Sequence, residues 1–139
     1  MYYGGEYRKM GLFSKKFQSA LKALTTLEEA LQAEYSIFVR DSAIQRFEYT
    51  TEALWKCLQS YLNEYEGIVS SSPKACMREA KKVKILNDNE TELALEMIDD
   101  RNLTAHTYHE EVAEMLFKRL PQYAVLMKKI LEKIKIVLR

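Results

Sequence analysis

The chain has 139 residues, which is enough for one domain with a buried core, and its composition excludes a disordered protein. Apolar residues make up 47% of the chain and charged residues 29%, as is typical of a globular protein. Because 21 Lys and Arg residues nearly balance 20 Asp and Glu residues, no global field draws the protein to nucleic acid. With only four Gly and two Pro residues, the composition favours helices.

Cysteine usage and hydropathy limit the compartment and the kind of site. Cys57 and Cys76 are isolated and have neither metal-ligand nor CxxC spacing. Without a signal peptide, they are expected to be reduced thiols of a cytoplasmic protein. No apolar run approaches the roughly 20 residues of a membrane span, so we expect no membrane association. The sequence predicts neither a metal site nor a cofactor.

Charged residues are unevenly distributed along the chain. Two basic runs flank an acidic run. The first basic run contains Lys74, Arg78, Lys81, Lys82 and Lys84, the acidic run Asp88, Glu90, Glu92, Glu96, Asp99 and Asp100, and the second basic run Lys128, Lys129, Lys133, Lys135 and Arg139. These runs are interpreted as solvated helix faces, and the alternative is a groove that faces phosphate groups.

The first helix is expected after an N-terminal segment that lacks a helical period. We predict that residues 1–11 form a flexible tail. From Leu12 onward, apolar residues recur at alternating steps of four and three, which predicts a helix that ends near Glu34. The apolar stripe consists of Phe13, Phe17, Ala20, Leu24, Leu27 and Leu31.

A second helix is predicted to begin between Arg40 and Ser42, where Ser42 and Gln45 fit a capping box. It runs to about Tyr65, and Gly67 supplies the stop signal.

Trp55 lies on this second helix and has two interpretations. Its helical spacing beside Leu54 and Leu58 predicts a tryptophan that packs in the core. The alternative is a platform on which a base stacks.

Ser72 and Pro73 form the strongest helix start signal in the chain, because an N-cap serine precedes a proline at the first helical position. They predict a short third helix that extends to about Val83. A fourth helix is predicted from about Glu90.

The C-terminal stretch, residues 110–139, has a helical apolar pattern with one interruption at Pro121. This proline either kinks one helix or starts a new one. No strand pattern occurs in the sequence. We therefore predict an all-α protein, an antiparallel up-and-down four-helix bundle over residues 12–139 with a short extra helix.

The fourth helix leads into the octapeptide Arg101-Asn102-Leu103-Thr104-Ala105-His106-Thr107-Tyr108, where guanidinium, amide, imidazole and phenol groups meet. Arg101 occupies a position of the apolar stripe, and an unpaired buried charge is costly. Either a partner carboxylate lies opposite Arg101, or its face borders a cavity or a subunit interface. The alternative is a purely structural role, in which His106 lies on the surface and Arg101 pairs with Asp99 or Glu96.

On an ideal helix, the polar side chains of the octapeptide can line one wall. Such a wall has the groups to cleave RNA without a metal. His106 would take the proton of a ribose 2′-hydroxyl, and Arg101 would stabilise charge on the phosphate oxygens. A second copy of the site across a two-fold axis would supply the acid.

The pattern Arg101-Asn102-x-x-x-His106 resembles the Arg-polar-x(3)-His signature of the HEPN superfamily. With Tyr108 behind it, it resembles the HEPN toxin subunits that pair with minimal nucleotidyltransferases. Residues 44–50, 54–56, 72–73, 78–80 and 99–111 are similar to the nucleotidyltransferase substrate-binding proteins, and the similarity extends over about residues 17–135. Lys84-Ile85-Leu86 stands where this family has a Gly-Leu-Ile-like turn.

The resemblance implies a HEPN-like bundle that forms a homodimer, and a separately encoded minimal nucleotidyltransferase as partner. In the toxin branch, Arg101 and His106 would be the catalytic residues of a metal-independent endoribonuclease that acts on RNA. Asn102 would support them, and Tyr108 would be the hydroxyl that the partner caps with AMP. We take this toxin–antitoxin-like pair as the main expectation.

In the substrate-binding branch, which is the alternative, the same cleft presents a substrate to the partner and has no chemistry of its own. A third possibility is a plain helical bundle in which the octapeptide is only structural. The chain lacks a Gly-Ser followed by paired Asp residues, so any nucleotide transfer would reside in the partner.

Overall fold

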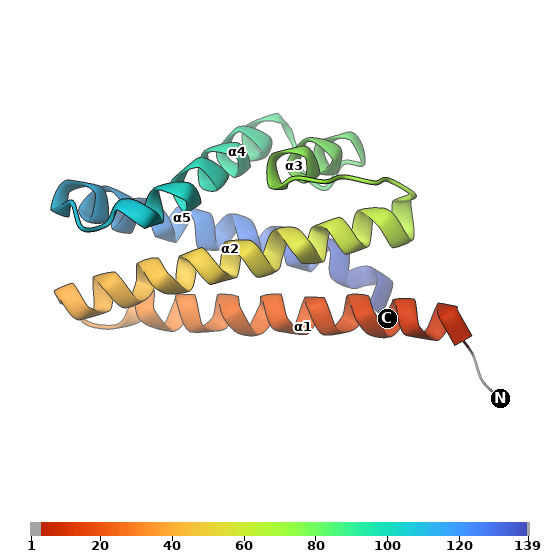
Figure 1. The fold of residues 1–139 in the computed structure, drawn as a ribbon, viewed down its shortest axis with the longest axis horizontal. Helices are drawn as coiled ribbons and strands as arrows, with labels where there is room; N and C mark the ends of the chain where they lie inside the picture. The colour runs from red at the N-terminus through yellow and green to blue at the C-terminus, as the bar shows by residue number, and fades with distance from the viewer. Residues whose placement is uncertain (1–3, 139) are drawn as a thin grey trace.

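The computed structural model of the protein describes residues 4–138, with side chains from residue 11 onward, and over that range it consists of helices joined by short turns and loops (Figure 1). The α-helices are α1 (Gly4–Gln32), α2 (Ile37–Glu66), α3 (Pro73–Lys82), α4 (Asp88–Leu103) and α5 (Glu110–Ile134). Two short 3-10 helices, η1 (Thr104–His106) and η2 (Lys135–Leu138), follow α4 and α5. The predicted all-α fold is confirmed.

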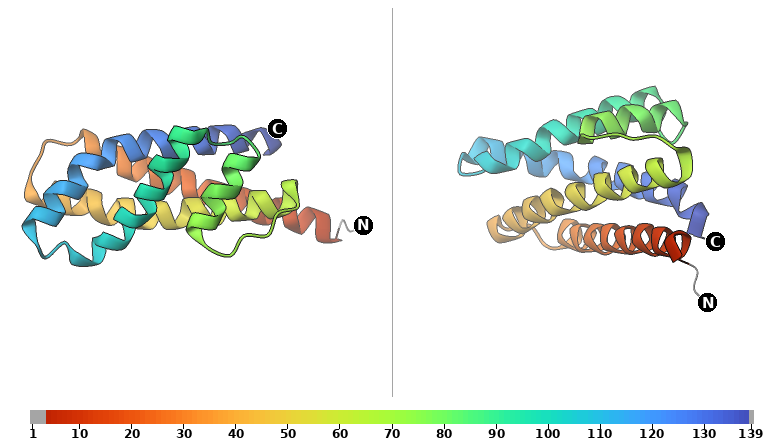
Figure 2. Two further views of the ribbon diagram at one scale, coloured as in Figure 1. Left: turned by 90° about the horizontal axis from the view of Figure 1, so that it is seen from above. Right: turned by 45° about the vertical axis from the view of Figure 1, so that its right-hand side comes forward.

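Four long helices alternate in direction, as expected for an up-and-down bundle. Helices α1 and α2 lie side by side, and α5 packs against both of them (Figures 1 and 2). Helix α4 packs on α5, while the short α3 packs against α2 and α4. Helices α2, α3 and α4 therefore meet on one side of the bundle, next to Asp100, where the acidic run ends.

The apolar stripes predicted from the sequence form the core. In α1, the stripe residues from Phe13 to Leu27 are buried, and Leu31 is half-buried. The rings of Phe47 on α2 and Tyr123 on α5 stack with centroids 5.5 Å apart. Burial of such a side chain contributes about 1.5–3 kcal/mol, so the core holds α1, α2 and α5 as one rigid frame.

The start of α2 differs from the prediction. Ser36 is the N-cap, and its hydroxyl accepts a hydrogen bond from the Val39 N–H at 3.0 Å. Ser42 lies inside the helix, so the capping box predicted for Ser42 and Gln45 is wrong. The first turn was missed because Phe38 is 87% exposed and adds nothing to an apolar stripe.

A capping box does occur at α4. The Asn87 side chain accepts a hydrogen bond from the Glu90 N–H at 2.8 Å, and the Glu90 carboxylate accepts one from the Asn87 N–H at 2.9 Å. The Ser72 and Pro73 start of α3 and the Gly67 stop of α2 are confirmed. Gly67 has a φ of 68°, the left-handed conformation that glycine adopts most readily.

Lys84 also adopts the left-handed conformation, with a φ of 67°. A non-glycine residue in this region of φ/ψ space carries a strain of about 1 kcal/mol or more. Glycine, which the resemblance led us to expect in the turn where this chain has Lys84-Ile85-Leu86, would adopt this conformation without such strain. The Ile85 carbonyl accepts a hydrogen bond from Lys133 Nζ at 2.9 Å, which ties the turn to α5.

The two terminal helices, α1 and α5, differ in part from the sequence prediction. Helix α5 continues through Pro121, so this proline does not start a new helix. The helical backbone of α1 begins at Gly4, eight residues before the predicted start at Leu12. The flexible tail over residues 1–11 stays a prediction, and residues 1–3 lie outside the described residues.

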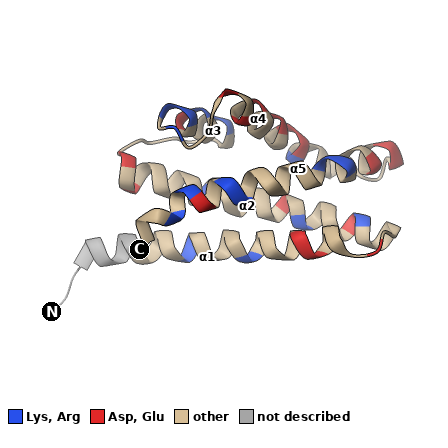
Figure 3. Ribbon diagram, turned by 180° about the vertical axis from the view of Figure 1, so that it is seen from behind, with Lys and Arg blue, Asp and Glu red and all other residues tan. Residues whose placement is uncertain are grey.

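The first basic run and the acidic run face each other across α3 and α4 (Figure 3). Lys74 pairs with Asp99 at 2.7 Å, and Lys81 pairs with Asp88 at 3.1 Å. The two runs thus partly neutralise each other. Along residues 4–138, no helix combines the length and the apolar character needed to cross a membrane.

Candidate functional site

The octapeptide is not one continuous helix. Helix α4 ends at Leu103, η1 covers Thr104–His106, and His109 is the N-cap residue of α5. The Thr104 hydroxyl donates a hydrogen bond to the Arg101 carbonyl at 2.7 Å, a local bond that competes with helix continuation. The ideal continuous helix on which the polar groups were placed is therefore wrong, because the helix changes to a 3-10 turn at Thr104–His106.

Asp100 anchors the end of α4 to α5. It is only 2% exposed, and both of its oxygens accept hydrogen bonds from Arg119 Nη1 at 3.0 Å. The fully buried Tyr123 also donates its hydroxyl proton to Asp100, and Glu96 lies 3.0 Å from the same hydroxyl. Burial, followed by these carboxylates, raises the pKa of Tyr123 well above its ordinary value.

Arg101 faces away from α5, toward α2. Its Nη2 lies 3.0 Å from Glu52 Oε1, and its Nε is buried without a hydrogen-bond partner. The alternative interpretation, in which Arg101 pairs with Asp99 or Glu96, is wrong, because these carboxylates contact Lys74 and Tyr123 instead. A carboxylate opposite Arg101 and a cavity beside it were expected as alternatives, and the structure contains both.

The cavity lies where α2, α3 and α4 meet and has a volume of about 310 Å³. It is lined by Thr51, Glu52, Trp55, Ser72, Pro73, Lys74, Ile98, Arg101 and Asn102. Trp55 packs against the core, as predicted, but it is half-buried and also forms part of the cavity wall. Its indole Nε1 is buried and has no partner. A buried donor without a partner costs about 1–3 kcal/mol, so the cavity wall contains two unfavourable groups.

His106 and Tyr108 lie in the turn that follows and are both exposed. Tyr108 is 73% exposed, and its hydroxyl lies 3.2 Å from His106 Nδ1. Its ring also contacts His109, with centroids 4.4 Å apart. The structure therefore brings Arg101 together with Asn102 at the cavity, and His106 together with Tyr108 at the turn.

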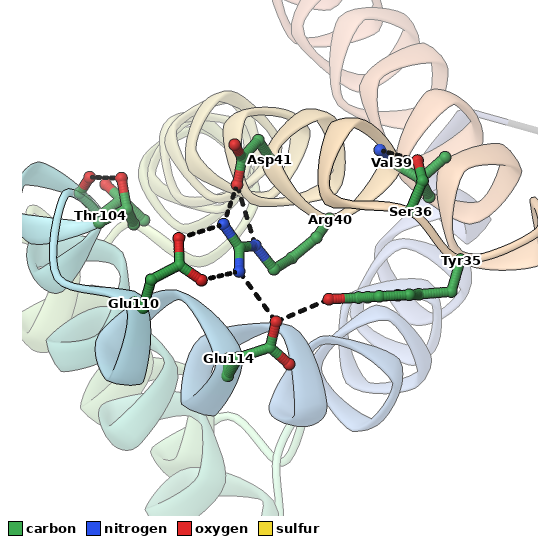
Figure 4. Close-up of polar contacts among 9 residues, drawn as sticks. Tyr35, Ser36, Val39, Arg40, Asp41, Thr104, Glu110 and Glu114 are labelled. Carbon is green, nitrogen blue, oxygen red and sulfur yellow. Dashed lines mark hydrogen bonds and ion pairs between the residues drawn. The ribbon is translucent and has the colours of Figure 1, made fainter.

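A second polar cluster, centred on Arg40, was not foreseen from the sequence (Figure 4). Arg40 is 2% exposed and its guanidinium contacts Glu110 at 2.7 Å, Glu114 at 2.8 Å and Asp41 at 3.0 Å. Tyr35 donates a hydrogen bond to Glu114 at 2.6 Å. The cluster ties the start of α2 to the first turns of α5, directly after the octapeptide. The one sequence signal was the spacing of Glu110 and Glu114, four residues apart on one helix face.

These contacts shift the acid–base equilibria of the cluster. The hydrogen bond from Arg40 lowers the pKa of Glu110, and those from Tyr35 and Arg40 lower the pKa of Glu114. The same carboxylates raise the pKa of Arg40.

Elsewhere, burial raises the pKa of Cys57 to about 12, which fits an unreactive thiol. Among residues 11–138, no group of three or more His, Cys, Asp or Glu side chains is arranged to hold a metal ion.

Comparison with known proteins places this arrangement in a family. Residues 15–136 match the family described as nucleotidyltransferase substrate binding protein like. The chain belongs to this family. The match spans the helices that form the cavity, together with the octapeptide and the Arg40 cluster.

Two solved structures resemble this nucleotidyltransferase substrate-binding-like protein. A protein from Thermus thermophilus is 53% identical, with 84% of this chain and 98% of that chain covered and a TM-score of 0.81. A Haemophilus influenzae protein is 22% identical, with coverages of 91% and 98% and a TM-score of 0.61. Its structure is described as revealing the fold of a substrate-binding domain of a nucleotidyltransferase, and at this identity the likeness shows a shared fold. Among curated proteins, none matches the chain significantly.

Replacing Asp100 is expected to loosen the end of α4. Asp100→Asn removes the charge that holds Arg119 and Tyr123, and we expect a loss of about 2–3 kcal/mol in the free energy of unfolding. The matched control is Asp99→Asn, which removes a carboxylate that is 61% exposed and should cost less than about 1 kcal/mol. Urea denaturation of the three proteins measures both values. Equal losses in the two variants would contradict the anchoring role of Asp100.

Proposed function

We propose that the chain is the substrate-binding subunit of a two-component nucleotidyltransferase and carries out no transfer chemistry itself. The partner would be a minimal nucleotidyltransferase encoded nearby. Family membership over residues 15–136 supports a role beside a nucleotidyltransferase. The observation that carries the proposal is the cavity beside Arg101, because it gives the chain a place to hold a substrate.

The cavity has the properties of a small-molecule site. Its volume of about 310 Å³ is at the lower end of the range for such sites. Trp55 and Ile98 provide apolar surface, while Arg101, Lys74 and Asn102 provide hydrogen-bond donors. Because every lining residue except Ser72 belongs to one of three packed helices, the site is largely held in shape before a ligand arrives.

We also propose that the subunit is a homodimer with the octapeptide near the two-fold axis. Its support is the exposed turn that carries His106 and Tyr108, an aromatic and polar surface of the kind enriched at interfaces. In such a dimer, the exposed turn would meet a second copy or the transferase, while the cavity stays open on the α3 side.

Association with the transferase is the direct test of this function. The chain, co-expressed with the nucleotidyltransferase encoded beside it and carrying the only affinity tag, should retain the untagged transferase through affinity and size-exclusion steps. An Arg101→Gln variant should retain it equally well, because Arg101 lines the cavity and not the exposed turn. If the two proteins elute separately, the proposed function is wrong.

A second candidate is the metal-independent endoribonuclease toxin with Arg101 and His106 as catalytic residues. The observation in its favour is the accessible pair of His106 and Tyr108, which places an imidazole 3.2 Å from a hydroxyl that a partner can modify. Within one chain, however, the Arg101 guanidinium is engaged by Glu52 and the imidazole by Tyr108. The substrate-binding role does not require Arg101 and His106 to act together on one substrate, so we favour it.

Two measurements separate the candidates. The substrate-binding role predicts that RNA stays intact when incubated with the purified homodimer in EDTA. Cleavage that is lost in His106→Ala would instead establish the ribonuclease. The toxin candidate also predicts that co-expression with the transferase raises the intact mass by one or more AMP units, and that Tyr108→Phe abolishes this increase. An unchanged mass would count against Tyr108 as the modified residue.

A further inference from the structure

Two residues of the cavity wall each carry a buried hydrogen-bond donor that has no partner in the protein. Four buried side-chain polar atoms among the described residues have no partner: Thr50 Oγ1, Trp55 Nε1, Glu64 Oε2 and Arg101 Nε. Two of them, on Trp55 and Arg101, belong to residues that line the cavity, and both are N–H donors. Because buried donors in native proteins are nearly always paired, these two donors lack an acceptor that an outside molecule could supply once a covering side chain moves.

Arg101 shows what kind of acceptor would fit. The Nε and Nη2 atoms of arginine form one planar edge that can bind two oxygens of a carboxylate or a phosphate at once. Glu52 uses only half of this edge, since its Oε1 lies 3.0 Å from Nη2 while Nε has no partner. The Arg101 edge is therefore incompletely filled by the protein's own carboxylate.

The Glu52–Arg101 pair is also replaceable. Its side chains are 36% and 32% exposed, and ion pairs with this much solvent access contribute little to stability. Glu52 can turn toward solvent without leaving a buried charge behind. An incoming oxyanion that engages both Nε and Nη2 would make the stronger, bidentate contact.

Lys74 adds a second cation to the same wall. Its ammonium contacts Asp99, whose side chain is 61% exposed and is not part of the cavity lining. The charged residues that line the cavity are thus Lys74, Arg101 and Glu52, and once Glu52 turns away only the two cations remain. Trp55, Pro73 and Ile98, which line the same cavity, supply apolar surface suited to a flat ring.

We propose that this cavity binds a small planar molecule that carries an oxyanion, either a phosphate or a carboxylate. The oxyanion displaces Glu52 and pairs with Arg101 and Lys74, while the ring lies against Trp55. The inference rests on the proposed function in one respect, because the bound molecule would be the group presented to the nucleotidyltransferase. Glu52 thereby acts as an internal competitor that holds Arg101 until a ligand arrives.

Trp55 allows a direct test, because it is the only tryptophan in the chain and lines the cavity. Its fluorescence is measured during titration of the isolated protein with phenyl phosphate, benzoate or phenol at constant ionic strength. Phenyl phosphate or benzoate should change the emission with a saturable curve, and their relative affinities identify the preferred oxyanion. Phenol, which has the same ring without the charge, should bind at least about tenfold more weakly.

Single substitutions then assign the contacts. Arg101→Gln and Lys74→Gln should each weaken binding of the preferred probe, Arg101→Gln by about tenfold or more. Glu52→Gln should tighten it, because the competitor loses its charge. Lys22→Gln on α1 is the control for a change of net charge and should have no effect, since Lys22 is exposed and no residue of α1 lines the cavity. Circular dichroism melts verify that each variant is folded.

The tightening by Glu52→Gln is the outcome that a purely structural ion pair does not predict. The inference is overturned if no oxyanion probe changes the emission, if phenol binds as well as phenyl phosphate, or if Glu52→Gln weakens binding. These outcomes are independent of transferase association. Binding without association would refute the proposed function alone, and association without binding would refute only this inference.

Discussion

The buried carboxylate of Asp100 determines the direction in which the end of α4 faces. A carboxylate that is 2% exposed requires charged or hydrogen-bonding partners, and Arg119 and Tyr123 of α5 provide them. Successive residues of a helix point about 100° apart. Once Asp100 is held on α5, Arg101 must therefore point toward α2, where Glu52 and the cavity lie. The candidate site follows from this anchor.

The two polar clusters divide the octapeptide into a fixed half and an exposed half. Asp100 holds its beginning, and the Arg40 cluster holds the first turns of α5 beyond its end. Between these points, His106 and Tyr108 remain exposed in η1 and the turn. The fixed half lines the cavity, and the exposed half is accessible to another chain. This division fits a subunit that holds a substrate on one side and meets partners on the other.

Much of the fold followed from local patterns. The stripe from Phe13 to Leu27, the Ser72 and Pro73 start and the Gly67 stop depend on residues close in sequence, and all were predicted correctly. The start of α2 was missed because its first turn carries exposed apolar side chains such as Phe38, which give no periodic signal.

The site was predicted only in part, because its geometry depends on partners that are distant in sequence. Arg101 was recognised as a charge in an apolar stripe, but nothing local identified Glu52 as its partner. The same holds for Arg119 and Asp100, which are 19 residues apart, and for Arg40 and Glu110, which are 70 apart. Such pairings are specified by the packing of whole helices. The break at Thr104 depends on a threonine hydroxyl bond that competes only weakly with the helix, so a continuous helix was the natural expectation.

The most direct test of this account is the rate at which the Arg101 Nε proton exchanges with solvent, measured by nuclear magnetic resonance and assigned with Arg101→Gln. If Asp100 holds Arg101 against the cavity wall, this buried proton exchanges slowly in the native protein and at least about tenfold faster in Asp100→Asn. Exchange in Asp99→Asn should match the native rate. The same rate in the native protein and Asp100→Asn would contradict the account, because Arg101 would then be held in place without the Asp100 anchor.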